Sequence, residues 1–265
     1  MSNTRKRTQP SSETSPNFVQ SLARGLSVIE AMGASGGPMT LSEAAVATGL
    51  SRAAARRLLL TLEGLGYVAS NGRKFQLTPR VLGLGYSFLA SLPLAQVVQP
   101  HMERLVDEVH ESCSVSVLDG QEIVYVARVP TKRIVTVNLS VGARLPAYVT
   151  SMGRVLLAGL TPCELDAYFA HAVLVARTGR TVTAQAELRR VLSAIARQGW
   201  ALVDQEFEEG VRSLAVPLRD REGRVVAAMN VSAAGARATR AQLQRDVLPL
   251  LQAAAGQIEA SLRHR

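Results

Sequence analysis

Apolar residues at helical spacing open the patterned part of the chain. Four of them recur three or four positions apart: Phe18, Leu22, Leu26 and Ile29. This spacing predicts an amphipathic helix that ends in the Gly33–Pro38 segment. Residues 1–17, in contrast, hold no apolar residue after Met1 and are rich in Ser, Thr, Pro and charge. They are predicted to form a disordered basic tail, because they have too little apolar surface to bury.

The next pattern predicts two short helices joined by a tight turn. Thr40 and Glu43 form a Thr-x-x-Glu capping box, which marks a helix start, and Gly49 suits the left-handed conformation that ends a helix. Ser51 is then a good N-cap for a second helix. Five apolar residues of this second helix share one face: Ala55, Leu58, Leu59, Leu62 and Leu65.

A hairpin signal follows the second helix. Residues 67–70 and 75–78 have strand character and flank Asn71-Gly72, a strong signal for a tight hairpin turn. Helix, short helix, turn, helix and hairpin in this order predict a winged helix-turn-helix over residues 18–78. The alternative is a small structural bundle whose basic residues are only solvated.

A connecting helix and a larger domain are predicted behind this unit. Residues 79–93 predict a linker helix that is weakened by glycine and ended by Pro93. Beyond it, strands are predicted at 113–118, 122–129, 134–141, 200–204, 213–220 and 225–233. Helices are predicted at 96–112, 151–160, 162–169, 186–199 and 238–265. Strands beside strands with helices grouped around them indicate an antiparallel α+β fold for residues 94–265.

Charge changes the picture of the first domain. Residues 1–80 hold ten Lys and Arg against four Glu, so +6 of the net charge of +9 lies there and +3 is spread over the other 185 residues. This imbalance favours a polyanionic partner for the first domain alone. No apolar run approaches 18 residues and the N-terminal segment has no secretory signal pattern, so a cytoplasmic protein is expected.

Motifs in both halves resemble the IclR family of bacterial transcriptional regulators, from Phe18 to the last helix. They include LSEAAVATGLSRAAARRLLLTLEGLGYV, VGARLPAYVTSMGRVLLAGL and GWALVDQEFEEGVRSLAVPLRDREGRVVAAMNVSA. The commoner family form has Ala and Lys where this chain has Met152 and Arg154. This departure resembles the branch that governs protocatechuate, 4-hydroxybenzoate and β-ketoadipate breakdown. The resemblance implies a GAF/profilin-like effector-binding domain, no cofactor, a homodimer through the N-terminal half, and often a tetramer.

A DNA-contacting surface is expected where the second helix enters the major groove. The expected contacts are Thr40, Ser42, Ser51, Arg52, Ala53, Arg56, Arg57, Arg73 and Lys74. Arginine binds guanine in a bidentate way and alanine touches a thymine methyl group. Arg57 is expected to hold either a phosphate or an internal acid, and the two remain open.

A ligand pocket is expected in the second domain. By resemblance, it is lined by Leu145, Ser151, Met152, Ser213, Asn230 and Ser232. A small aromatic acid or dicarboxylate also needs a cation, for which Arg133, Arg144 and Arg154 are the nearby options. Arg144 is the first choice because it opens the pocket loop, beside Leu145 and Tyr148 as an apolar wall. The alternative for Arg144 is a surface ion pair.

The sequence leaves three other functions to consider: an enzyme, a thiol switch and a metal site. An enzyme fused to a DNA-binding module would need a nucleophile, a base and an orienting acid, and no such set is evident. A thiol switch would use Cys113 or Cys163, but neither has a basic neighbour within three residues. Four acids, Asp204, Glu206, Glu208 and Glu209, form a metal site, orient the arginines of the pocket, or simply solvate a loop. The set His101, His110, Glu111 and Cys113 does not match zinc-ligand spacing.

Overall fold

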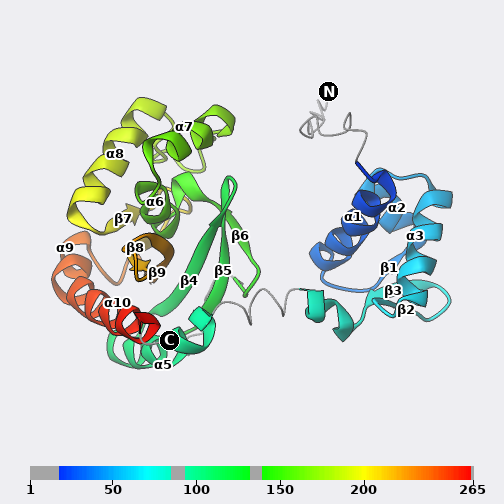
Figure 1. Cartoon of the computed structure of the whole chain (residues 1–265), viewed down its shortest axis with the longest axis horizontal. Coiled ribbons are helices and arrows are strands. Elements are labelled where there is room, and N and C mark those ends of the chain that lie inside the picture. The colour runs from blue at the N-terminus through cyan, green and yellow to red at the C-terminus, as the bar shows by residue number, and fades with distance from the viewer. Residues whose placement is uncertain (1–17, 85–92, 132–138, 264–265) are drawn as a thin grey trace. The chain divides into compact units, whose positions relative to one another are not determined.

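The chain forms two compact units, Met1–Phe88 and Leu89–Arg265. The computed structural model describes residues 18–84, 93–131 and 139–263, and its elements are labelled in Figure 1. Within these ranges no helix has the length and apolar character needed to cross a membrane. The predicted tail over 1–17 lies outside the described residues, as does most of the predicted linker helix over 79–93. Of that helix, Pro79–Val81 forms a 3-10 turn (η1).

The first unit is the predicted winged helix-turn-helix. Its helices are α1 (Gln20–Ala34), α2 (Leu41–Thr48) and α3 (Arg52–Gly64). Its strands are β1 (Met39–Thr40), β2 (Val68–Ser70) and β3 (Lys74–Leu77), which pair antiparallel in the order β1-β3-β2. Buried Val28, Met32 and Leu59 hold the helices together.

The predicted capping residues are confirmed. The Thr40 side chain and the Glu43 carboxylate each accept a backbone N–H of the other residue, and Gly49 ends α2 with a φ of 67°. The Ser51 hydroxyl accepts the N–H of Ala54 at 3.2 Å at the start of α3. These caps satisfy backbone groups that would otherwise lack partners at the helix ends, and they fix the tight turn between α2 and α3.

The predicted helix is present as α1, but most of its predicted apolar stripe does not pack on the core, and one residue predicted to be buried in α3 is exposed. Phe18, Leu22 and Leu26 are 37%, 62% and 48% exposed. The reason is that α1 carries a second apolar stripe, and this stripe, with Val28 and Met32, packs on the core. Of the predicted stripe, Ile29 packs against the core. Leu65 is 52% exposed because α3 ends at Gly64 and Leu65 is its C-cap.

An antiparallel sheet of six strands organises the second unit. The strands are β4 (Ser112–Asp119), β5 (Glu122–Val129), β6 (Arg144–Pro146), β7 (Ala201–Asp204), β8 (Val211–Arg219) and β9 (Val225–Ala234). Their order is β6-β5-β4-β9-β8-β7. The antiparallel α+β prediction is therefore confirmed.

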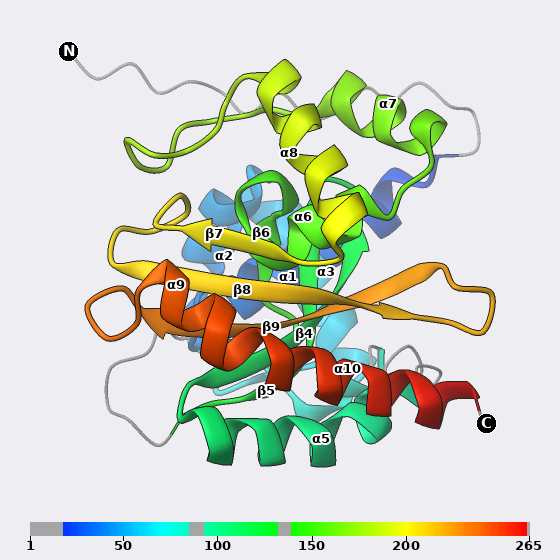
Figure 2. The ribbon, with the colours of Figure 1, turned by 90° about the vertical axis from the view of Figure 1, so that its left-hand side faces the viewer.

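Helices cover the sheet from two sides. On one side lie α5 (Pro93–Val109) and the C-terminal run of α9 (Arg240–Gln242), η3 (Leu243–Val247) and α10 (Leu248–Arg263). On the other lie η2 (Ala147–Val149), α6 (Ser151–Ala158), α7 (Pro162–His171) and α8 (Gln185–Gln198). Figure 2 shows α5 and α10 side by side, with α6 and α8 across the sheet from them.

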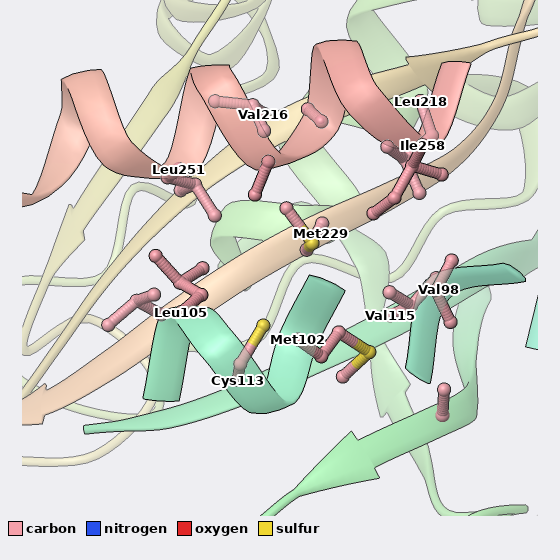
Figure 3. Close-up of a cluster of buried hydrophobic side chains, with 14 of the residues drawn as sticks. Val98, Met102, Leu105, Cys113, Val115, Val216, Leu218, Met229, Leu251 and Ile258 are labelled. Atoms are coloured by element: carbon pink, nitrogen blue, oxygen red, sulfur yellow. The ribbon is translucent and has the colours of Figure 1, made fainter. Parts of the chain in front are cut away.

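The main hydrophobic core lies between the sheet and the α5–α10 pair. Figure 3 shows Met102 of α5, Met229 of β9 and Ile258 of α10 converging there. Cys113 and Val115 of β4 point into this core and are fully buried. Because side chains alternate along a strand, Ser112, Ser114 and Ser116, which alternate with them, occupy the opposite face of the sheet, where α6 lies.

One predicted strand differs from the structure. The segment 134–141 was predicted as a strand; residues 132–138 lie outside the described part, and 139–141 are not a strand. Gly142 instead makes a turn with a φ of 88° and donates its N–H to the carbonyl of Tyr125 at 2.8 Å. The strand that pairs with β5 there is β6, three residues long.

Candidate functional site

The exposed side of α3 is basic. Arg52, Ala53, Arg56 and Arg57 are all exposed, while Ala55, Leu59 and Leu62 face the core. The positive side chains therefore project from a helix whose other face is anchored. This arrangement suits insertion of the first turns of α3 into a major groove.

The rest of the predicted DNA surface divides into capping and exposed residues. Thr40 is half-buried and its hydroxyl is engaged with Glu43, so its first task is to start α2. Ser42 is exposed, and so is Ser51, the N-cap of α3. At the hairpin tip, the Asn71 side-chain oxygen accepts the N–H groups of Arg73 and Lys74 at 3.2 and 2.9 Å. Both of these basic side chains are exposed.

A cavity of about 500 Å³ opens in the second unit, on the serine-bearing face of the sheet. It lies between β4, β5, β8 and β9 on one side, the start of α6 on another, and the loop after β7. The structure brings six of the eight predicted ligand-binding residues to its wall: Leu145, Ser151, Met152, Ser213, Asn230 and Ser232. Its volume suits a small metabolite.

A hydrogen-bond network of four side chains forms the polar part of the wall. The hydroxyls of Ser151 and Ser213 are 2.7 Å apart. The Asn230 amide nitrogen donates to Ser213 at 2.8 Å and to Ser232 at 3.0 Å, and Ser232 donates to Ser213 at 3.2 Å. Asn230 is 4% exposed, and its Oδ1 has no partner within the described residues.

Arg128 of β5 is a cation of the cavity wall, although it is not among the residues predicted from the sequence. It lies opposite Ser114, which in turn lies opposite Asn230, so the three residues form one row across three strands. The Arg128 guanidinium donates to the Ser114 hydroxyl at 3.2 Å. No carboxylate forms an ion pair with Arg128 among the residues that the structure describes.

The structure does not bring Arg144 to the cavity. Its guanidinium donates to Glu122 at 2.8 Å and to the Asp119 carboxylate at 2.7 Å, which is the surface ion pair named as the alternative. The physical reason is strand alternation. Arg144 and Leu145 are neighbours in β6 and point to opposite faces, and Leu145 takes the cavity side.

Three other predicted residues also lie away from the wall or cannot be placed. Tyr148 is buried, and its hydroxyl donates to the Val175 carbonyl at 2.6 Å. Arg154 is buried and forms a bidentate ion pair with Glu206, at 2.7 and 2.5 Å. Arg133 lies outside the described residues. Neither Tyr148 nor Arg154 lines the cavity.

One ion pair lies at the cavity wall. The Arg237 guanidinium donates two hydrogen bonds of 3.0 Å to the Glu111 carboxylate, and both residues line the cavity. Two of the four predicted acids also engage arginines: Asp204, the last residue of β7, binds Arg212, and Glu206 of the following loop binds Arg154. Across the described ranges, no group of three His, Cys, Asp or Glu side chains is placed to hold a metal ion.

The sequence does carry a pattern for the polar, cavity-side face of β4, which the sequence-based prediction did not include. Ser112, Ser114 and Ser116 alternate with Cys113 and Val115 in one strand, a pattern that puts hydroxyls on one face and apolar groups on the other. Arg128 carried no comparable local signal. Its place in the wall depends on the pairing of β4 with β5, which skips one residue at an irregularity near Val115 and Ser116.

Two family models match this chain. The IclR helix-turn-helix domain matches residues 21–72, and the C-terminal domain of bacterial IclR transcriptional regulators matches residues 86–260. The fold and the two surfaces thus define a DNA-binding transcriptional regulator with a separate effector-binding domain. The chain belongs to the IclR family.

Relatives and solved structures agree with this assignment. The Pca regulon regulatory protein of Pseudomonas putida is 46% identical over 240 residues, covering 90% of this chain and 82% of that protein. A Rhodococcus sp. RHA1 structure, described as a candidate transcriptional regulator, is 53% identical with a TM-score of 0.82, covering 92% of this chain and 98% of that one. An IclR homologue from Microbacterium hydrocarbonoxydans, complexed with 4-hydroxybenzoate, is 28% identical with a TM-score of 0.81, covering 93% and 100%.

Proposed function

We propose that this chain regulates an operon for the breakdown of aromatic compounds and responds to a small aromatic acid or dicarboxylate. The single observation that carries the proposal is the cavity of about 500 Å³, which has an arginine, Arg128, without an ion-pair partner among the described residues. A carboxylate of the effector would form an ion pair with that guanidinium, because charge-assisted hydrogen bonds are stronger than neutral ones.

The comparisons support the same class of effector. A relative at 46% identity is a Pca regulon regulatory protein, and a solved homologue at 28% identity holds 4-hydroxybenzoate. In this proposal Arg128, and not the initially predicted Arg144, is the counter-charge of the effector. Leu145 and Met152 supply apolar wall, and Ser151, Ser213, Asn230 and Ser232 supply hydrogen bonds.

DNA binding is assigned to the first unit. Arg52, Ala53 and Arg56 would meet base edges, and Arg57 with the wing residues Arg73 and Lys74 would meet phosphates. Ser42 and Ser51 would contact the backbone near the two helix starts. Thr40 would act there mainly by capping α2, because its hydroxyl is already engaged.

The proposed protein forms a homodimer through its N-terminal half and can assemble further into a tetramer. It acts in the cytoplasm. One helix-turn-helix reads few base pairs, so two copies are needed for a specific operator. Phe18, just before α1, and Leu22 and Leu26 of α1 are exposed apolar residues and form a suitable contact for a second copy.

Regulation without catalysis fits the side chains better than the two alternatives. Among the described residues, the cavity wall pairs Glu111 with Arg237 and holds no cysteine or histidine. A thiol switch at Cys113 is disfavoured, because burial raises the pKa of this thiol to about 12. We propose that the protein is not an enzyme and that the loop acids position arginines.

A thermal-shift screen tests the effector class. Full-length protein is heated with aromatic acids and with their ring-cleavage products, since a ligand that binds the folded state raises its melting temperature. We expect at least one acid to raise the melting temperature and to change affinity for the operator. Failure of every acid on both measurements contradicts the proposal.

A further inference from the structure

The tip of the wing, which is the hairpin of β2 and β3, holds a chemically labile pair of residues. Among the asparagines of the sequence, only Asn71 is followed by a glycine, and both Asn71 and Gly72 are exposed. A backbone nitrogen can attack the side-chain amide of the asparagine before it, and a glycine hinders this attack least because it has no side chain. Within the described residues, no heavy atom beyond the chain neighbours lies within 4 Å of the position that a Cβ of Gly72 would occupy.

The side-chain carbonyl of Asn71 is polarised for such an attack. Its oxygen accepts the backbone N–H groups of Arg73 at 3.2 Å and of Lys74 at 2.9 Å. Attack on the carbonyl carbon places negative charge on this oxygen, and N–H donors that already point at it stabilise that charge. The exposed cationic side chains of Arg73 and Lys74 also favour the anionic form of the Gly72 nitrogen, which is the attacking species.

We propose that Asn71 is a site of spontaneous deamidation, and that its conversion weakens the binding of the wing to DNA. Hydroxide removes the hydrogen of the Gly72 nitrogen, which then forms a bond to the side-chain carbonyl carbon of Asn71. The bond from that carbon to the amide nitrogen breaks, the amide nitrogen takes a proton from water, and ammonia leaves a five-membered succinimide ring behind. Water opens the ring at either of its two carbonyl carbons, which gives aspartate or isoaspartate.

One hydrogen bond opposes this reaction. The Gly72 N–H donates to the Ser70 hydroxyl at 3.0 Å. The nitrogen has to lose this hydrogen before it attacks, and a hydrogen bond made by the protonated form of a group favours that form. Ser70 therefore slows the conversion of Asn71. The sequence alone marks the Asn-Gly pair as labile, whereas the restraint by Ser70 follows from the folded hairpin.

The conversion changes the charge of the surface that is assigned to DNA. Arg73 and Lys74 give residues 71–74 a charge of +2, and one new carboxylate lowers it to +1. In the aspartate form the carboxylate can still accept both backbone N–H groups, and it is a stronger acceptor than the amide. The turn is therefore kept while phosphates meet less positive charge, which weakens binding to every DNA sequence. This effect rests on the proposed contact between the wing and DNA.

Ageing of the full-length protein tests the chemistry. The protein is incubated in mildly alkaline buffer, and mass spectrometry of its digested peptides follows the loss of the amide group over time. We expect Asn71 to convert while Asn230, which is buried in β9 and precedes Val231, stays intact over the same period. Ser70→Ala should raise the rate at Asn71 about fivefold, the equivalent of one hydrogen bond.

Fluorescence anisotropy connects the conversion to DNA binding. Converted parent protein and fresh Asn71→Asp should both bind operator and unrelated duplexes about two- to fivefold more weakly than fresh parent, as expected for one exposed charge. The slope of log affinity against log salt should fall by roughly one ion equivalent. Asn71→Ser is the matched control, because a serine hydroxyl can accept a backbone N–H of the turn and has no amide to lose. Its affinity should not change during ageing.

Each contrary outcome has a distinct meaning. If Asn71 stays unmodified for a period in which the urea-unfolded protein converts, the proposal is overturned. An unchanged rate in Ser70→Ala overturns the restraint by Ser70. If Asn71→Asp binds DNA like the parent while joint replacement of Arg73 and Lys74 with alanine weakens binding, the effect of deamidation on DNA binding fails and the proposed wing contact stands. If neither change alters binding, the wing contact of the proposed function fails, and the effect of deamidation fails with it.

Discussion

Arg154 and Glu206 form a buried bidentate ion pair that joins α6 to the loop after β7. The arginine side chain is 3% exposed and the glutamate side chain is 12% exposed. Arg154 also donates to the Tyr148 carbonyl at 2.8 Å, and Glu206 accepts the N–H of Val182 at 3.1 Å. The pair thus holds two walls of the cavity in place without touching the cavity itself.

Removing one partner of this pair should be costly. We expect Arg154→Met to lower the free energy of unfolding by about 3–5 kcal/mol, because it leaves a buried carboxylate without its cation. Urea denaturation measures the change. Arg144→Gln is the control, since its partners are exposed and such pairs contribute about 0–1 kcal/mol. Equal losses in the two variants would contradict the structural role of the pair.

The counter-charge of the effector is tested by two arginine variants. We expect Arg128→Gln to weaken carboxylate binding by about 1.5–3 kcal/mol, the usual worth of a hydrogen bond to a charged group. Arg144→Gln should leave the affinity unchanged, because Arg144 points away from the cavity. Calorimetry with the most tightly bound acid decides between them. The reverse pattern would show that Arg144, and not Arg128, is the counter-charge.

Base reading is assigned to the exposed side of α3. Arg52→Ala and Arg56→Ala should each weaken operator binding by about 1–3 kcal/mol for each base that the removed arginine would bind, with a smaller effect on unrelated DNA. Arg24→Ala, an exposed arginine of α1, is the matched control. Fluorescence anisotropy with operator and scrambled duplexes separates the two effects. Unchanged operator binding in both α3 variants would remove this face from the interface.

The wing should contribute through charge alone. Replacing Arg73 and Lys74 together with alanine is expected to weaken binding to every DNA sequence. The slope of log affinity against log salt should fall by roughly two ion equivalents if both side chains meet phosphate. Titrations at several salt concentrations give the slope. A slope equal to that of the parent would show that the wing does not touch DNA.

The two cysteines should differ in reactivity. Cys113 is fully buried and burial raises its pKa to about 12, whereas Cys163 is exposed. Because the thiolate is the reacting form, a thiol reagent at pH 8 should modify one cysteine in the folded protein and both in denaturant. Rapid modification of Cys113 in the folded state would mean that the core between β4 and α5 opens readily.

Local chemistry explains which predictions succeeded. The caps at Thr40, Gly49 and Ser51 and the Asn71-Gly72 turn depend on residues within a few positions of one another, so the sequence predicts them. The burial of α1 could not be predicted in this way, because two apolar stripes compete and only tertiary packing selects Val28 and Met32. Strand alternation, applied to β6, would have separated Arg144 from Leu145.

Long-range strand pairing explains why Arg128 and the polar network could not be predicted from the sequence. Arg128 joins Ser114 and Asn230 only because β5, β4 and β9 are neighbours in the sheet, although the chain separates Arg128 from Asn230 by more than a hundred residues. The polar network has the same origin, since its four members come from α6, β8 and β9. No spacing rule along the sequence indicates such a meeting.

The alternation of residues in β4 and β9 also separates two kinds of evolutionary constraint. Cys113, Val115 and Met229 serve the core, while Ser114 and Asn230, next to them along the strands, serve the opposite face. If the cavity binds the effector as proposed, a substitution on its side would change what is recognised and leave the packing against α5 and α10 intact. Descendants of one scaffold can therefore diverge toward new inducers through single changes, each tested by selection while the protein remains folded.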